Sequence, residues 1–310
     1  MKRAKVLLGA TVIGLAAICG AARSQETSAG PGASEIRAYE RVVQQTPGQD
    51  NGAAWWKLAM LYQDAARFED AERAYAKTLQ LMKGGNPIVL ANVMDCAGTL
   101  YVQLGQFAEG EELELKALSI RQEQKDSLGV GLSWMHLAML SLGKHDNANG
   151  EAYAELAVER LVSKEGSDAA TGEQKMTALT YLALARCAAH ECKDAMAPVM
   201  RAMTIADASY AENSFPMSYL HFLEGYVDWK RGDHGIAAKL MKSGTEQMEA
   251  QLGWNHPTFV TAMQQYEAFL VVTHRDAEAA EVRVKFVRFA GRNTATQTVI
   301  AFRATSLPKR

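Results

Sequence analysis

Residues 55–75, with the sequence WWKLAMLYQDAARFEDAERAY, decide the fold of this chain. Bulky apolar residues recur three and four positions apart on both sides of a polar break, and two small residues, Ala59 and Ala71, stand among them. This spacing predicts two amphipathic helices in a hairpin, with the small residues at the closest approach. Because neither helix can bury its apolar face alone, the hairpin needs neighbours.

The hairpin pattern recurs along the chain, and the polar or glycine-containing turns between paired helices predict six units. They cover residues 51–81, 89–120, 128–161, 175–206, 217–252 and a last unit from 256 onward. An unpaired helix at 33–45, within the segment 33–50, is expected to cap the stack, since terminal units of repeat proteins differ from inner ones. Residues 163–175, rich in Gly, Ser and charge, are expected to form the longest loop.

The recurring small and bulky positions resemble those of the tetratricopeptide repeat (TPR) family. The small positions are Ala59, Ala71, Gly98, Ala117, Ala183, Ala195, Ala202, Gly225 and Ala237. Unit starts lie about 38 to 47 residues apart, longer than the basic period of about 34, which is similar to the kinesin-light-chain-like subgroup of bacterial proteins. The resemblance implies an all-α domain over residues 51–290, a right-handed superhelical solenoid of stacked antiparallel helix hairpins.

The N-terminal residues have the layout of a secretory signal peptide over residues 1–24. Three basic residues precede an apolar run, Val6–Cys19, and small residues follow it. The run has 14 residues, fewer than the roughly 20 of a membrane-spanning helix, so cleavage is expected and a retained anchor is the alternative. Ile18 stands where a bacterial lipobox has a small residue, which argues against lipidation of Cys19. No later segment is expected to span a membrane.

The charge of the processed chain argues against nucleic acid as a partner. Without residues 1–24, 29 basic residues face 35 acidic ones, a net charge of about −6, and no basic stripe runs along the chain. The exception is the C-terminal end, where seven basic residues and no acidic one follow Val282. Its last part, residues 291–310, is expected to be a basic and flexible tail.

Three cysteines remain after processing, and two of them are close in sequence. Cys187 and Cys192 could form a disulfide across a turn in an oxidising compartment, or remain two buried thiols. A metal site that includes His190 is a further alternative, although two thiols and one imidazole at this spacing match no common zinc pattern.

Motifs for catalysis and for cofactors are not found in the sequence. The segment His190–Asp194 begins like a zinc-protease helix, but Asp194 stands where the second histidine is required. The pair Gly129 and Gly131 lacks the third glycine of a dinucleotide-binding turn and follows a polar loop. We therefore expect a protein that is not an enzyme and has no cofactor, no bound metal and no catalytic residue.

The remaining functional signal is the concave groove that the resemblance implies, which the first helix of each hairpin lines with the residues between its packing positions. In this chain those residues are Trp56, Met60, Gln63, Asp64, Asn92, Asp95, Thr99, Gln103, Tyr219, Phe222, Tyr226, Trp229 and Lys230. Aromatic side chains on a concave face can anchor a peptide or helix. The four aromatics of the last group can instead belong to the core, and this alternative stays open.

These observations predict an exported scaffold or adaptor in the periplasm or outside the cell. It would bind a protein or peptide segment in its groove without performing a reaction, and it would touch a membrane only through an uncleaved signal segment. The alternatives are a structural subunit of an envelope assembly and an accessory or regulatory subunit of an envelope enzyme. Neither the partner nor the oligomeric state follows from the sequence.

Overall fold

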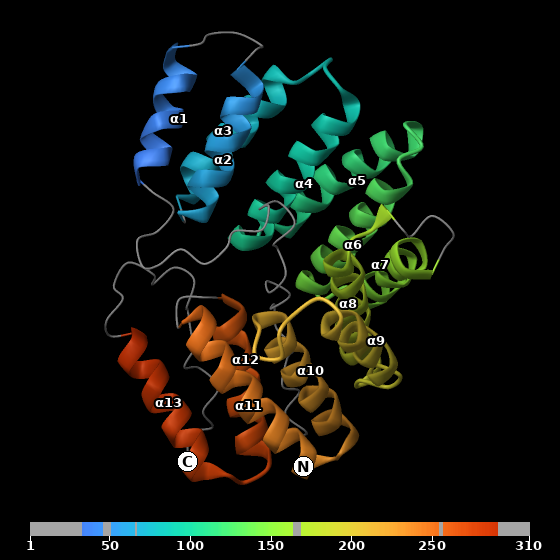
Figure 1. Ribbon diagram of the computed structural model, residues 1–310, viewed down its shortest axis with the longest axis vertical. Helices are drawn as coiled ribbons and strands as arrows, with labels where there is room; N and C mark the ends of the chain where they lie inside the picture. The colour runs from blue at the N-terminus through green and yellow to red at the C-terminus, as the bar shows by residue number, and fades with distance from the viewer. Residues whose placement is uncertain (1–32, 46–50, 66, 164–168, 254–256, 291–310) are drawn as a thin grey trace. The chain divides into compact units, whose positions relative to one another are not determined.

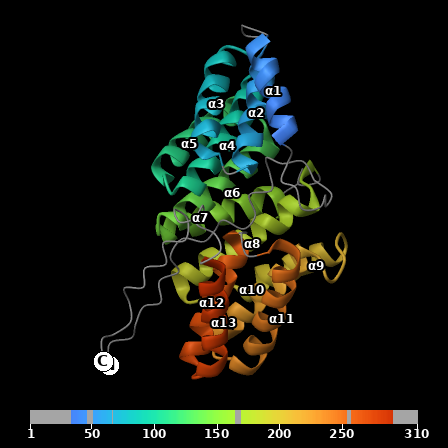
Figure 2. The ribbon, with the colours of Figure 1, turned by 90° about the vertical axis from the view of Figure 1, so that its left-hand side faces the viewer.

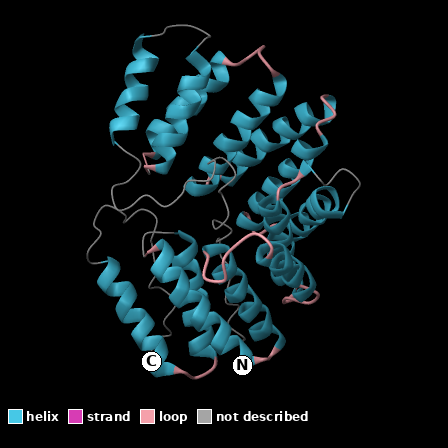
Figure 3. Cartoon of the chain, viewed as in Figure 1, coloured by secondary structure: helices cyan, strands magenta, loops and turns pink. Residues whose placement is uncertain are grey.

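The computed structural model describes residues 33–45, 51–65, 67–163, 169–253 and 257–290. These residues form thirteen α-helices and a short π-helical segment, and no strand occurs among them (Figure 3). They fall into two compact units, 33–212 and 213–290. The expected signal segment, 1–24, and the expected tail, 291–310, lie outside the described residues.

The first unit contains a single helix, α1 (Ala33–Gln45), and four hairpins. The hairpins pair α2 (Gly52–Asp64) with α3 (Phe68–Leu81), α4 (Pro87–Leu104) with α5 (Phe107–Glu123), α6 (Ser127–Gly143) with α7 (Asn147–Val158), and α8 (Gly172–His190) with α9 (Met196–Asp207). Figures 1 and 2 both show the two helices of each of the first two hairpins side by side. Helix α1 packs against α2 of the first hairpin, and its role as a cap of the stack remains a prediction.

The second unit contains the last two hairpins. They pair α10 (Phe215–Arg231) with α11 (His234–Leu252), and α12 (Pro257–Val272) with α13 (Asp276–Ala290). Helix α12 also contacts α10 and α11, so the two hairpins stack on each other. All six expected hairpins are therefore present, and the prediction of an all-α stack of paired helices is confirmed.

Local polar groups set the ends of the helices. The side chain of Asn86 accepts hydrogen bonds from the backbone N–H groups of Ile88 and Val89 at the start of α4. This helix ends at Gly105, whose left-handed backbone (φ 72°) suits a residue without a side chain. At α8, Thr171 and Gln174 form a reciprocal capping box. The helix therefore begins within the stretch that we expected to be the longest loop.

Small residues lie where helices approach most closely. All nine predicted small positions are buried. In the second unit, Gly225 on α10 and Gly244 on α11 lie at such a close approach. A Cβ atom on Gly244 would lie 2.8 Å from the backbone oxygen of Ser218, and one on Gly225 would lie 2.8 Å from the Cβ of Leu240. The backbones of α10 and α11 therefore touch at positions where any side chain would collide.

Helix α4 is long and apolar enough to cross a membrane, contrary to the expectation that no later segment would be. It is instead a core helix of the first unit, because it packs against α2, α3, α5 and α6. Its residues Val93 and Leu100 are fully buried in a cluster with side chains of α1, α2 and α3. Half of the helix is buried inside the protein, which accounts for much of its apolar character.

Candidate functional site

The four predicted groove residues on α2 are accessible to different degrees. Asp64 is exposed, whereas Trp56, Met60 and Gln63 are half-buried. Trp56 and Met60 rest against the core of the first hairpin. The amide of Gln63 accepts from the Tyr75 hydroxyl at 2.8 Å and donates to the side-chain oxygen of Gln103 at 2.9 Å. Gln63 thus links α2, α3 and α4.

The predicted groove residues on α4 belong largely to an internal polar network. Asp95 and Thr99 are buried, at 5% and 4% exposure, and Asn92 and Gln103 are half-buried. The Thr99 hydroxyl donates to the backbone oxygen of Cys96 at 2.7 Å. In this structure Asp95 and Thr99 are therefore not in a position to contact a partner.

The aromatic stripe on α10 lies mostly in the core of the second unit. Phe222 and Tyr226 are each 2% exposed and Trp229 is 7% exposed, while Tyr219 and Lys230 are half-buried. Trp229 packs edge-to-face against Tyr226 and against Phe269 of α12, with ring centroids 5.6 Å apart in each pair. The ammonium of Lys230 lies 4.1 Å from the Trp229 ring centroid, over the indole. Phe222, Tyr226 and Trp229 are therefore core residues, which is the second of the two alternatives given for this stripe.

A cluster of buried ionisable residues joins α4, α5 and α6. Its centre is Arg121, which is 1% exposed. The guanidinium holds both carboxylate oxygens of Asp95 with its two terminal nitrogens. It also donates to the Ser133 hydroxyl at 2.7 Å and to the Asn92 side-chain oxygen at 2.9 Å. This bidentate geometry is the one that a planar guanidinium favours with a carboxylate.

The second part of this cluster is a carboxylate–imidazole pair. Glu114 is 0% exposed and His136 is 2% exposed. The Nδ1 atom of His136 lies 3.1 Å from Oε1 of Glu114 and 4.0 Å from Oδ2 of Asp95. Gly98 makes room for this pair, since a Cβ atom there would lie 3.0 Å from Oε1 of Glu114. We call Asp95, Glu114, Arg121 and His136 the ionic cluster.

Charge and burial act against each other in the ionic cluster. Burial raises the pKa of Asp95 to about 7, and the charge of Glu114 adds to the rise, while His136 and Arg121 oppose it. Burial alone would lower the pKa of His136, but the carboxylates of Glu114 and Asp95 outweigh that effect and raise it. The folded cluster therefore binds a proton more readily than its separated side chains would.

The ionic cluster suits a proton better than a metal ion. Atoms of Asp95, Glu114 and His136 all lie within 4.8 Å of one another, a donor set that a divalent cation could use. A cation would compete with Arg121 for Asp95, and two carboxylates, one guanidinium and one divalent ion leave a net charge of +1. With a proton on His136 the same four side chains sum to zero. Since burying net charge is costly, the protonated arrangement is favoured.

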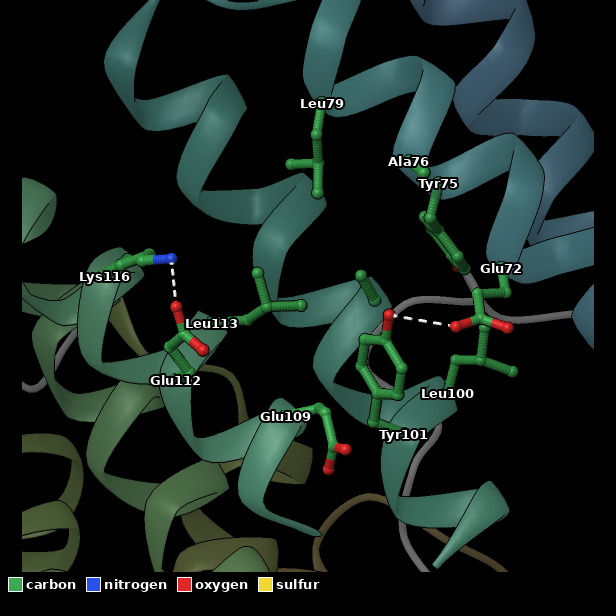
Figure 4. A pocket seen from close by; sticks show the side chains of 11 residues that line it. Glu72, Tyr75, Ala76, Leu79, Leu100, Tyr101, Glu109, Glu112, Leu113 and Lys116 are labelled. Carbon is green, nitrogen blue, oxygen red and sulfur yellow. Dashed lines mark hydrogen bonds and ion pairs between the residues drawn. The ribbon is translucent and has the colours of Figure 1, made fainter. Parts of the chain in front are cut away.

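A separate cavity opens between α3, α4 and α5, with a volume of about 220 Å³. Leu79, Leu100 and Leu113 line it together with the rings of Tyr75 and Tyr101 (Figure 4). Three carboxylates and one ammonium complete the lining, namely Glu72, Glu109, Glu112 and Lys116. None of these residues belongs to the ionic cluster or to the predicted groove.

The structure joins Cys187 and Cys192 in a disulfide. Cys187 lies in the last turn of α8, and Cys192 follows the end of that helix. The bond thus holds the turn that leads into α9, as the first of the three alternatives for these cysteines requires.

Comparisons with known proteins place this arrangement among helical repeat structures. The sequence matches no profile of a known protein family and no curated protein. In structure it is similar to BtubC (BKLC) from P. vanneervenii, with a TM-score of 0.56, 20% identity, and coverage of 72% of this chain and 90% of that one. It is also similar to kinesin light chain TPR-like repeats from Podosopora anserina, with a TM-score of 0.53, 13% identity, and coverage of 67% and 99%.

A third similar structure is a signal transduction ATPase with a tetratricopeptide repeat sensor from Pyrococcus horikoshii. Its TM-score is 0.61 at 13% identity, with coverage of 84% of this chain and 38% of that one. The protein has a TPR-like fold. The resemblance inferred from the small and bulky positions is thereby confirmed at the level of the fold.

Within this TPR-like fold, the ionic cluster is the feature that the sequence did not reveal. Its members come from three helices and are separated by up to 41 positions, Asp95 to His136, so no local motif contains them. One signal was present. Arg121 and Glu114 both fall on the inward face of α5, together with Ala117 and Leu118, where a charged residue needs a partner.

Proposed function

We propose that this protein is an exported scaffold that binds a segment of another protein on the first helices of its hairpins, without catalysing a reaction. The TPR-like fold indicates a protein-interaction scaffold. The observation that carries the proposal is the pair Trp56 and Met60 on α2, two large apolar side chains that are only half-buried although they adjoin the core. Half-buried aromatic residues beside a rigid core are suited to act as binding anchors.

The non-catalytic part of the proposal is supported by the burial of the ionic cluster. Catalytic acids and bases must reach a substrate, and such groups usually lie in a cleft. Here Glu114, Arg121 and His136 are at most 2% exposed, and the cavity on α3, α4 and α5 is lined by other residues. Their charged groups pair with one another and with Asp95 inside the protein, between α4, α5 and α6.

Export is supported by the sequence of residues 1–24 and by the chemistry of the cysteines. The N-terminal layout is that of a cleaved signal peptide. A disulfide between Cys187 and Cys192 is compatible with an oxidising compartment such as the periplasm. The proposal therefore places the mature protein in the bacterial cell envelope or outside the cell.

The binding proposal is tested with adjacent tryptophans. Peptides selected from a random display library against the folded chain would be measured by fluorescence polarisation against Trp56→Ala and Trp55→Ala. We expect Trp56→Ala to weaken peptide binding at least tenfold, because an aromatic anchor contributes about 2 kcal/mol or more. Trp55 is equally half-buried against this core, but it stands in the apolar packing pattern of the hairpin rather than between its packing positions. Its loss should therefore lower stability while leaving the affinity of the folded protein unchanged.

Thermal unfolding of both variants provides the control for folding. If both substitutions lower stability by about 3 to 5 kcal/mol, as core truncations do, and neither changes affinity, Trp56 is a core residue and the proposed surface on α2 is wrong. If no peptide can be selected at all, the scaffold function itself loses its support.

A further inference from the structure

The cavity between α3, α4 and α5 has room for a compact apolar group. Its volume of about 220 Å³ lies below the roughly 300 to 1,000 Å³ of pockets that hold drug-sized ligands. Its floor is apolar, because Leu100 is 0% exposed and the ring of Tyr75 is 2% exposed. Leu79 on α3 and Leu113 on α5 are half-buried at its edge. One aromatic ring or a short branched chain placed there would cover these leucines.

The rim of the cavity carries a net negative charge. Glu112 forms an ion pair with Lys116 at 2.6 Å, so these two charges balance each other (Figure 4). Neither Glu72 nor Glu109 forms an ion pair with any residue that the structure describes. The rim therefore lacks a positive charge that would balance these two carboxylates.

The two carboxylates come from different helices and act on one tyrosine. Glu72 on α3 accepts a hydrogen bond from the Tyr101 hydroxyl at 3.3 Å. Burial raises the pKa of Tyr101, and the charges of Glu72 and of Glu109 on α5 add to the rise. A primary ammonium ion has three N–H donors. Held beside Tyr101, it could donate to both carboxylates and to the hydroxyl oxygen.

The order of polar and apolar groups sets the orientation of an occupant. Leu100 at the floor is fully buried, whereas Glu72 is half-buried and Glu109 is exposed at the rim. A lysine or arginine side chain that entered the cavity would bring its charge to the apolar floor, which is costly. A molecule whose apolar body enters first and whose cation stays at the rim complements both parts.

We propose that this cavity binds a small primary ammonium ion with a compact apolar body, and that the ammonium lies between Glu72 and Glu109. The hydrocarbon packs against Leu79, Leu100 and Leu113. A free arylalkylamine and the apolar N-terminal residue of a peptide share this chemistry. The site goes beyond the proposed scaffold function and does not depend on it, because none of its residues lies on α2.

The experiment titrates the isotope-labelled full chain with phenethylammonium chloride at constant ionic strength. Amide chemical shifts in NMR spectra give both the position and the dissociation constant. We expect saturable shifts on α3, α4 and α5 around the cavity. Phenethyl alcohol has the same body without the charge, and methylammonium has the charge without the body. Each should bind at least about fivefold more weakly than phenethylammonium.

A peptide distinguishes the two sources of the ammonium ion. Phenylalanyl-glycyl-glycine amide has the same ring and a free N-terminus, and its N-acetylated form lacks the charge. If the free peptide binds at least as tightly as phenethylammonium and the acetylated one does not, the ligand is the end of a chain. If the free peptide binds more weakly, the ligand is a free amine.

Substitutions at the rim and at the wall test the position of the ligand. Glu72→Gln and Glu109→Gln should each weaken phenethylammonium binding about threefold to fivefold and leave phenethyl alcohol binding unchanged. Ala76 is exposed and lines the cavity, and Ala76→Phe should weaken amine binding at least about tenfold because its ring occupies the space. Circular dichroism should show that every variant is folded.

The matched control is Glu123→Gln, the same loss of charge at an exposed position near the other end of α5. It should leave amine binding unchanged. Shifts that do not saturate, or that map to other surfaces, would overturn the proposal. So would equal binding of phenethylammonium and phenethyl alcohol, or an equal loss in Glu109→Gln and Glu123→Gln, because the attraction would then be a general effect of charge.

Discussion

Arg121 holds together a buried polar network from a position that is 1% exposed. Its guanidinium contacts Asp95, Asn92 and Ser133, which lie on two different helices, α4 and α6. Replacing it with Met would keep most of the volume but would leave the buried carboxylate of Asp95 without its ion-pair partner. The role of Arg121 is therefore to stabilise this carboxylate in the core.

We predict that Arg121→Met lowers the free energy of unfolding by about 3 to 5 kcal/mol, the usual cost of removing one partner of a buried ion pair. Chemical denaturation measures this. Arg121→Lys should retain more stability than Arg121→Met but less than the parent, since an ammonium cannot form the bidentate contact with Asp95. Arg73→Met is the control, because Arg73 is an exposed ion-pair partner of Asp70 and its loss should cost at most about 1 kcal/mol. Equal effects of the two Met variants would contradict this role of Arg121.

His136 makes stability depend on pH. It faces Glu114 and Arg121 on α5 and Asp95 on α4, and its pKa is raised in the folded state. A group with a raised folded pKa stabilises the protein fully below its unfolded pKa, and that contribution is lost as the pH rises through the folded value. The pKa of Asp95, raised to about 7, acts in the same direction.

We therefore predict that the free energy of unfolding falls as the pH rises from about 6.5, the ordinary pKa of His136, and that His136→Gln flattens this dependence. Denaturant melts at several pH values measure it. His145→Asn is the control, because His145 lies exposed in the turn after α6 and its replacement should leave the slope unchanged. Stability that instead rises with pH in the parent protein would show that the cluster does not hold an extra proton.

At the scale of the helices, two glycines of α11 have opposite surroundings. A Cβ atom on Gly244 would lie 2.8 Å from the Ser218 backbone oxygen and 2.9 Å from the Cβ of Phe222, whereas nothing lies within 4 Å of one on Gly235. Gly244→Ala should separate α10 from α11 and cost about 1 to 3 kcal/mol. Gly235→Ala should instead stabilise the helix by about 0.5 to 1 kcal/mol, because alanine is the better helix former.

Thermal melts of these two variants compare the same substitution in the same helix. If both raise stability, the contact between α10 and α11 has room for a methyl group and is looser than the structure indicates.

The helix pairs could be predicted from the sequence because local spacing determines them. Small residues such as Ala71 and Gly225 interrupt apolar stripes at helical intervals, and the turns between helices contain glycine or polar residues. The start of α8 differs from the prediction because its cap, Thr171, lies in a stretch with the composition of a polar loop. A Thr followed three residues later by Gln was the signal for a helix start.

The site was harder to predict, because a residue between packing positions need not face solvent. Asp95 was expected in the groove, but its partner Arg121 is 26 residues away on another helix. Trp229 was assigned to the groove with the core as its alternative, and Phe269 packs against it from the next hairpin. A single sequence gives the face of a helix on which a residue lies, whereas its burial depends on which later helix packs there. Some of the predicted groove residues on α2 and α4 are accessible, and their role as a binding surface remains a prediction.

At the scale of the whole molecule, compartment and covalent structure are linked. The disulfide between Cys187 and Cys192 persists only where thiols are oxidised, and the N-terminal layout is the one that delivers a chain to such a place. If the protein stayed in the cytoplasm, both cysteines would remain reduced. The fraction of the protein that is exported should therefore match the fraction in which these two cysteines are oxidised.

We predict that the protein recovered outside the cytoplasm begins between Ala22 and Gln25 and that its Cys187 and Cys192 resist alkylation until a reductant is added. Leu15→Arg, which places a charge within the apolar run, should abolish processing, because a charged residue in the membrane-inserting part of a signal costs about 2.5 to 3.5 kcal/mol. The retained chain should keep Met1 and two alkylatable thiols at 187 and 192. Intact-mass measurement with and without alkylation reads both changes at once. If the parent protein keeps Met1 and is found in the membrane fraction, the apolar run is an anchor. If Cys187 and Cys192 are oxidised in the retained variant, the disulfide forms without export.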